Sequence, residues 1–186
     1  MKLFGLLLVL ISPLAAAGEL EFRDMNGQAQ RPFEKIDKAL VLIFIAHDCP
    51  IANKMAPEIK RICGDFGKRG VRICLVHAQA DLTAEAARKH AAEFGYDCPV
   101  LLDPKHELVK HAGATVTPEA AVFSADGKLQ YRGRINDLYV DLGKPRFAPS
   151  QHDLREALEA LLAGKEIKNP RTQAVGCLIS DMGAEK

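Results

Sequence analysis

The cysteine-proline pair Cys49-Pro50 is the clearest candidate for covalent chemistry in this sequence. It follows the apolar run 41–45, which is typical of a strand buried on both faces. Proline fits the first turn of a helix, and apolar residues then recur at helical spacing from Ile51 to Phe66. The pattern therefore places Cys49 where a buried strand ends and a helix begins.

This position favours the ionised form of the cysteine. The start of a helix offers unpaired N–H groups and a partial positive charge, and such settings lower a thiol pKa from about 8.5 to roughly 3.5–7.5. The neighbouring carboxylate of Asp48 would raise the Cys49 pKa, and a protonated His47 would partly offset that increase. We expect Cys49 to be an exposed, reactive thiolate in a loop shaped by His47, Asp48 and Pro50. The alternative is that Cys49 is a small buried hydrophobic residue.

The other cysteines constrain how Cys49 can be oxidised. The chain has five cysteines, so at least one thiol is left over. Cys63 lies fourteen positions along the same helix, about 21 Å from Cys49, whereas disulfide partners need Cα atoms within about 7 Å. Cys74 lies inside a core strand, and Cys98 lies in a loop at a strand edge. Cys63 and Cys74 are expected as two buried thiols, with a bridge between them as the alternative.

Cys177 lies about fifteen residues beyond the last predicted helix. An extended segment of that length spans roughly 50 Å, so Cys177 can reach Cys49. It is a candidate resolving cysteine, one that converts an oxidised Cys49 into an intramolecular disulfide. Two alternatives stay open: a structural cysteine of the tail, or a disulfide with Cys98.

The first residues resemble an export signal. Lys2 precedes the apolar run 3–14 and the small residues Ala15 to Ala17, and the apolar run is too short to span a bilayer as a helix. We expect residues 1–17 to be cleaved near Ala17, leaving a periplasmic or secreted protein without a stable membrane span. An uncleaved anchor is the alternative. The formal net charge is +1 and the basic residues are scattered, so nothing indicates a nucleic-acid partner.

The remaining chain reads as one domain, residues 18–168, followed by a tail, residues 169–186, that contains Cys177. The order of predicted elements gives an α/β sandwich, with a mixed central sheet flanked by helices and an N-terminal β-hairpin extension. Helices are expected at 50–66, 83–95, 108–111 and 151–162, core strands at 41–45, 71–76 and 100–102, and hairpins with turns at Asn26-Gly27 and Asp126-Gly127.

The residues around Cys49 resemble a known family. The segment Asp48-Cys-Pro-Ile-Ala-Asn53, together with Ala56-Pro-Glu58, Gly113-Ala-Thr-Val-Thr-Pro-Glu119 and Val175-Gly-Cys-Leu-Ile179, is similar to thioredoxin-fold redoxins, in particular the exported, peroxiredoxin-like branch of the AhpC/TSA group. The resemblance implies a thioredoxin-like sandwich and an antioxidant or thiol-exchange activity without a cofactor. It also implies that Thr117-Pro118 is a cis peptide bond facing Cys49, where Thr117 pairs with a bound thiol partner.

The departures from the family pattern narrow the activity. A Cys-x-x-Cys dithiol would need a cysteine at Ala52, and a Cys-x-x-x-Cys copper-handling relative would need one at Asn53. True peroxiredoxins carry Thr or Ser at the position of Ala46. With these motifs absent, the sequence retains Cys49 as a single nucleophilic thiol in a redox fold.

The sequence therefore predicts an exported thiol oxidoreductase in which Cys49 attacks a disulfide of a protein partner or a small peroxide. Thr117 and Pro118 would position the partner, and no metal is required. Two alternatives remain: a copper-handling protein that binds metal through His47, Cys49 and His77, and a redox-inert module that keeps the fold for partner contact. The sequence leaves the oligomeric state open.

Overall fold

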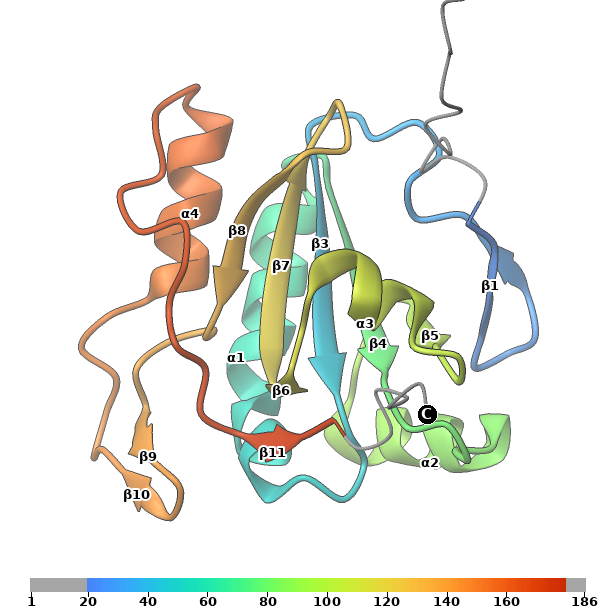
Figure 1. Ribbon diagram of the computed structural model, residues 1–186. Coiled ribbons are helices and arrows are strands. Elements are labelled where there is room, and N and C mark those ends of the chain that lie inside the picture. Colours follow the sequence, from blue (N-terminus) through green and yellow to red (C-terminus); the bar gives the residue numbers. More distant parts are fainter. Residues whose placement is uncertain (1–19, 180–186) are drawn as a thin grey trace, which may run out of the picture.

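The protein is a mixed β-sheet with helices on both faces (Figure 1). The computed structural model describes residues 20–179, so the expected signal segment 1–17 and residues 180–186 of the tail lie outside the described residues. The elements in chain order are β1 (Phe22–Asp24), β2 (Ala29–Gln30), β3 (Ala39–Ile45), α1 (Pro50–Gly67), β4 (Val71–His77), α2 (Ala84–Phe94), β5 (Val100–Leu102), α3 (Glu107–Ala112), β6 (Val116–Thr117), β7 (Glu119–Ser124), β8 (Leu129–Gly133), β9 (Tyr139–Asp141), β10 (Lys144–Pro145), α4 (Asp153–Leu162) and β11 (Cys177–Leu178).

The main sheet has seven strands in the order β2-β1-β5-β4-β3-β7-β8. Strand β4 pairs in parallel with β3 and β5, whereas β7 pairs antiparallel with both β3 and β8. The β1–β2 hairpin continues the sheet at its far edge, because β1 pairs antiparallel with β5. This arrangement confirms the predicted α/β sandwich, its mixed central sheet and its N-terminal hairpin.

Strand β3 lies at the centre because all seven of its residues are apolar and buried. Successive side chains of a strand point to opposite faces of the sheet. Val41 and Ile43 therefore belong to the apolar cluster that includes α1 and α4, whereas Leu40 and Leu42 belong to the cluster that includes α3. In Figure 1, α1 lies behind the sheet and α3 in front of it. The carboxyl end of β3 leads directly to Cys49.

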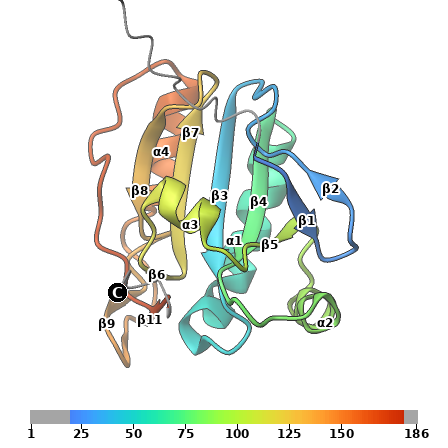
Figure 2. The same ribbon diagram turned by 45° about the vertical axis from the view of Figure 1, so that its right-hand side comes forward.

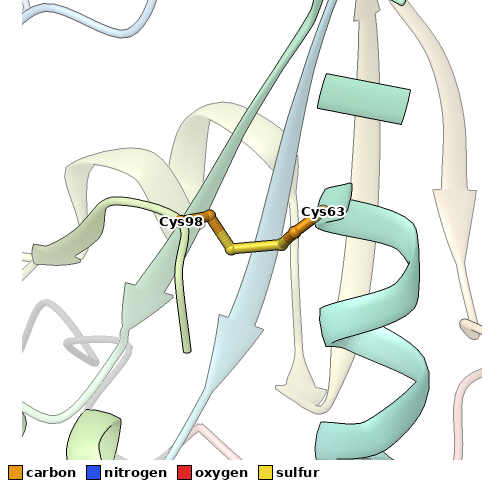
Figure 3. The surroundings of a disulfide bond; sticks show 2 residues. All are labelled: Cys63 and Cys98. Atoms are coloured by element: carbon orange, nitrogen blue, oxygen red, sulfur yellow. A yellow bond between two sulfur atoms is a disulfide. The ribbon is translucent and has the colours of Figure 1, made fainter. Parts of the chain in front are cut away.

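One prediction about the cysteines is wrong. Cys63 of α1 forms a disulfide with Cys98 in the loop before β5, with Cα atoms 6.2 Å apart (Figure 3). Cys63 packs on the sheet face that carries α1, whereas the side chain of Cys74 belongs to the cluster on the opposite face. Cys74 is therefore a buried free thiol, as expected, but it cannot reach Cys63. The pairing also removes Cys98 as a partner for Cys177.

The segment after α4 packs against the domain (Figures 1 and 2). It runs along β8, where Arg171 forms a parallel bridge with Arg132, and then reaches β6, with which β11 pairs antiparallel. Four short strands, β6, β9, β10 and β11, were not predicted. Because β11 contains Cys177, this packing places the last cysteine of the chain at the end of the sheet that carries Cys49.

Candidate functional site

Cys49 lies at the boundary between strand and helix that the sequence predicts. Strand β3 ends at Ile45, Cys49 has extended backbone angles (φ −87°, ψ 107°), and α1 begins at Pro50. The Cys49 N–H donates to the Ala46 carbonyl oxygen at 3.3 Å, and the Asn53 N–H donates to the Cys49 carbonyl oxygen at 3.0 Å. The first turn of the helix thus holds the cysteine backbone in place.

The loop between β6 and β7 lies against the Cys49 sulfur. The Thr117–Pro118 peptide bond is cis, as the family resemblance implied. The Cys49 thiol donates to the Thr117 carbonyl oxygen, with 3.0 Å between the sulfur and the oxygen. Two segments that are 68 residues apart in the sequence are therefore in direct contact at the Cys49 sulfur.

The Glu119 carboxylate supports this loop from inside. It is buried, accepts the Thr115 N–H at 2.8 Å, and forms an ion pair with Arg132 of β8 at 3.4 Å. Arg132 also donates to the Gly113 carbonyl oxygen. The sequence analysis assigned no role to Glu119 or Arg132, although Glu119 lies in a segment that carries the family resemblance. A charged residue at the start of a core strand was the available signal.

Strand β11 completes the site. Cys177 lies opposite Thr117 in the β6–β11 register, and the Ile179 N–H donates to the Thr115 carbonyl oxygen at 3.0 Å. Val175 and Cys177 pack against the small apolar cluster that contains Cys49. The structure therefore brings together Cys49, Thr117, Pro118 and Cys177, which are the four residues predicted to take part in thiol chemistry.

The burial of Cys49 differs from the expectation of an exposed thiolate. Its side chain is 0% exposed, because the segment that carries Val175 and Cys177 covers it. Burial alone would favour the neutral thiol. The prediction of exposure failed because it considered only the helix start and not the return of the distant tail.

The two neighbouring thiols have pKa values shifted in opposite directions. Burial, the largest single influence on Cys49, raises its pKa, but the Cys177 thiol, the Ala52 backbone N–H and the side chain of Thr117 together bring the pKa below that of an ordinary thiol. Burial raises the pKa of Cys177 to about 12, with further contributions from Cys49 and Asp48. The arrangement favours a thiolate at Cys49 and a proton on Cys177.

The loop residues His47 and Asp48 are exposed, and both bind a residue that the sequence analysis missed. The Gln79 side-chain carbonyl accepts the His47 N–H at 2.9 Å and lies 2.8 Å from His47 Nδ1. The Gln79 amide donates to the Asp48 carboxylate at 3.0 Å. Gln79 thereby ties the loop before Cys49 to the end of β4.

His77 is buried and contacts α2. Its Nε2 lies 3.3 Å from Nδ1 of His90, and the other ring nitrogen of His90 lies 2.9 Å from the Asn53 side-chain oxygen. Burial lowers the pKa of His77 from 6.5 to about 3, and the neighbouring His90 and His47 add to this effect. Asn53 also donates to the His47 carbonyl oxygen at 2.9 Å. A chain of polar contacts therefore links the Cys49 loop to the interior.

The proposed copper set of His47, Cys49 and His77 is not assembled in this arrangement: His47 binds Gln79, and His77 contacts His90. Within residues 20–179, no group of three or more His, Cys, Asp or Glu side chains is placed to hold a metal ion. No helix in the same range is both long and apolar enough to cross a bilayer. A cavity of about 160 Å³ opens beside Thr117, Cys177 and Gln79.

Comparisons with known proteins identify a family and related folds. Residues 24–138 match the family model described as Redoxin. The thiol-disulfide oxidoreductase ResA of Halalkalibacterium halodurans is 23% identical over 121 residues, which cover 62% of this chain and 67% of ResA.

Solved structures share the fold. An uncharacterized conserved protein from Geobacillus kaustophilus superposes with a TM-score of 0.75 at 28% identity, over 86% of each chain. A secreted Mycobacterium tuberculosis disulfide oxidoreductase, homologous to E. coli DsbE, superposes with a TM-score of 0.56 at 17% identity, over 80% of this chain and 97% of that one. The chain therefore has the thioredoxin-like architecture that the resemblance implied.

Proposed function

We propose that this chain, which belongs to the redoxin family, is an exported thiol oxidoreductase in which Cys49 is the nucleophile and Cys177 the resolving cysteine. One observation carries the proposal: Cys177 packs against Cys49, at the point where the Cys49 sulfur meets the cis Thr117-Pro118 loop. Two free cysteines that are far apart in the sequence are thus held together, whereas the third free cysteine, Cys74, lies apart in the core. The names of the relatives support thiol–disulfide exchange as the activity.

In the first step the Cys49 thiolate attacks one sulfur of a partner disulfide. A bond forms between Cys49 and that sulfur, the partner's other sulfur leaves as a thiolate, and a mixed disulfide results. A small peroxide would instead give a sulfenic acid on Cys49 and release an alcohol or water. The Ala52 N–H favours the Cys49 thiolate and so keeps this sulfur in its nucleophilic form before the attack.

In the second step Cys177 attacks the oxidised Cys49. The partner's sulfur, or the sulfenic oxygen as water, leaves, and a Cys49–Cys177 disulfide remains. The negative charge on Cys49 is one reason why the Cys177 pKa is high, and that charge disappears in the first step. Cys177 therefore becomes easier to deprotonate only after Cys49 has reacted, which sets the order of the two steps.

Disulfides are the better fit of the two substrate classes. Ala46 presents a methyl group where peroxiredoxins carry a hydroxyl, so the site lacks that group for positioning a peroxide oxygen. Thr117 instead offers an extended backbone segment, which suits a polypeptide partner.

Export is supported by the Cys63–Cys98 disulfide, because such bonds persist mainly in oxidising compartments. Residues 1–17 would direct the chain there and be removed near Ala17, so that residues 18–168 form the mature domain and residues 169–186 its tail. The mature protein would be periplasmic or secreted.

The test is to oxidise the protein with a small aromatic disulfide and to locate the new disulfide by mass spectrometry of peptides. We expect a Cys49–Cys177 linkage in the native chain. Cys177→Ser should stop at a mixed disulfide on Cys49, and Cys49→Ser should lose nearly all turnover, a fall of at least about a hundredfold. Cys74→Ala is the matched control, because Cys74 is a buried free thiol away from the site. Full turnover in Cys49→Ser would refute the proposal.

A further inference from the structure

We propose that the edge of β6 is a binding site for an extended, cysteine-containing polypeptide with the pattern Gly-Cys-x-aliphatic, and that residues 175–179 of this chain occupy the site as an internal competitor. The inference rests on the proposed function, since it assumes that Cys49 reacts with the bound cysteine. It adds the sequence pattern of the partner and the competition between that partner and the tail.

The first support is the pairing of β6. Strand β6 is separate from the seven-stranded sheet, and in the described part of the chain β11 is the strand that pairs with it. Thr117 lies opposite Cys177 and Val116 opposite Leu178, in antiparallel register. This pairing uses backbone groups, which any extended peptide can supply. A cysteine at the position of Cys177 is thereby placed against Cys49.

The residue before the bound cysteine must be small. A Cβ atom added at Gly176 would overlap the Thr117 carbonyl oxygen and crowd the Pro118 nitrogen, and both are backbone atoms of the loop that carries the site. Backbone atoms cannot move aside as a flexible side chain can. Glycine at this position is therefore a requirement of the site, which a partner must also meet.

The two residues after the cysteine differ in their constraints. The Leu178 side chain is 81% exposed, so the site selects nothing at that position. The Ile179 side chain is 8% exposed and belongs to the apolar cluster that contains α3. A partner gains affinity from an aliphatic residue there, because its burial removes apolar surface from water. Together these constraints give the pattern Gly-Cys-x-aliphatic.

The tail is tethered close to the site even when β11 detaches. Thr172 is anchored on β8: its N–H donates to the Arg132 carbonyl oxygen at 3.1 Å, and its hydroxyl lies 2.7 Å from the Tyr131 hydroxyl. Only a few residues separate this anchor from β11, so the competing strand stays at a high effective concentration. A partner therefore binds only during the fraction of time in which β11 is released.

The partner's strand and β11 must replace one another, because both pair with the same edge of β6. Cys177 and the partner's cysteine cannot both lie opposite Thr117. Cys49 attacks the partner's disulfide while β11 is released, and the partner's second sulfur leaves as a thiolate. When β11 returns, Cys177 attacks Cys49, displaces the partner's sulfur as a thiolate and displaces its strand. The partner's disulfide is reduced by two electrons to two thiols, and Cys49 and Cys177 are oxidised to a disulfide.

The experiment uses two blocked peptides, Ala-Val-Gly-Cys-Leu-Ile and the same peptide with valine in place of glycine, each joined through its cysteine to thionitrobenzoate. All proteins in this test carry Cys177→Ser, so that the release of thionitrobenzoate in the first turnover measures attack by Cys49 and not by Cys177. The rates are compared in alkaline buffer, where Cys49 is ionised whether or not residue 177 donates a hydrogen bond to it. We expect the glycine peptide to react roughly tenfold faster than the valine peptide. Gly176→Val of the chain should detach β11 and raise the rate with the glycine peptide roughly tenfold, because the competitor is lost.

Two further variants sharpen the test. Ile179→Ser should weaken the docking of β11 by removing its buried side chain, and it should raise the same rate. This variant provides the measurement if Gly176→Val folds poorly. Leu178→Ser is the matched control on the same strand, because its exposed side chain contributes little to docking.

Equal rates for the two peptides, or no acceleration in either detached variant, would overturn the inference while leaving the proposed function intact. A Cys49 that reacts with neither peptide nor with a small aromatic disulfide would instead refute the proposed function itself.

Discussion

Cys49 and Cys177 share one apolar cluster, yet only one of them favours the thiolate. The difference arises because two thiols in contact cannot both carry a charge at low cost. Cys49 receives N–H and thiol donors at the start of α1, whereas Cys177 lies on a strand edge and faces the charge of Cys49 and of Asp48. The direction in which each thiol pKa is shifted therefore follows from the position of its sulfur in the fold.

A prediction at this scale concerns the donor on Cys177. Serine at this position retains a hydroxyl that can donate to the Cys49 thiolate, whereas alanine retains no donor. We expect the pKa of Cys49 to be higher in Cys177→Ala than in Cys177→Ser, so that alkylation of Cys49 in mildly acidic buffer is roughly 3–10-fold slower in the alanine variant. The pH dependence of the alkylation rate measures this directly. Equal profiles for the two variants would mean that Cys177 does not stabilise the thiolate.

Between elements, the Cys63–Cys98 disulfide joins α1 to the loop that leads into β5, across 35 residues of sequence. A crosslink over a loop of this length stabilises a protein by roughly 3–4 kcal/mol, mainly by restricting the unfolded chain. We expect the double variant Cys63→Ala with Cys98→Ala to lose about that much free energy of unfolding, as measured by denaturant titration.

The site should remain intact in that variant, because neither cysteine contacts Cys49. The comparison is best made with Cys49→Ser and Cys177→Ser in both proteins, so that no other redox pair contributes. A loss below about 1 kcal/mol would show that the disulfide adds little to stability.

The same disulfide shows what sequence patterns can and cannot predict. Apolar periodicity located β3, β4 and α1, because burial in each depends on its own residues. The partner of Cys63 was missed because the position of Cys98 depends on how β5, which follows it, pairs with β4. Strand β11 was missed because its two residues carry no period, and its position depends on the distant β6.

For the candidate site, the sequence predicted Cys49 and its helix, and the resemblance added Thr117 and Pro118. Gln79, Asn53 and Glu119 were not assigned roles, since their contacts join segments far apart in the chain. Residue type alone does not distinguish such polar groups from surface residues. Long-range contacts were therefore the part of the site that patterns left out.

Across the whole molecule, burial of neutral histidines makes folding sensitive to acid. The pKa of His77 falls from 6.5 to about 3 in the folded protein, and burial also lowers the pKa of His90. Below pH 6.5 the unfolded chain takes up a proton at His77 that the folded protein does not, so stability decreases as the pH falls from about 6.5 toward 3. Above this range His77 is neutral in both states and its contribution is constant.

The variant His77→Asn tests this, because it keeps a polar side chain but cannot titrate. Between about pH 7 and about pH 4.5 we expect the native protein to lose about 2–3 kcal/mol more unfolding free energy than His77→Asn. His152→Asn, a change at an exposed histidine, should retain the native profile and serves as the control. Denaturant titrations at a series of pH values measure how the unfolding free energy of each protein depends on pH. Parallel curves for the native protein and His77→Asn would show that another group is responsible for the sensitivity to acid, and the His77–His90 contact would then have no part in it.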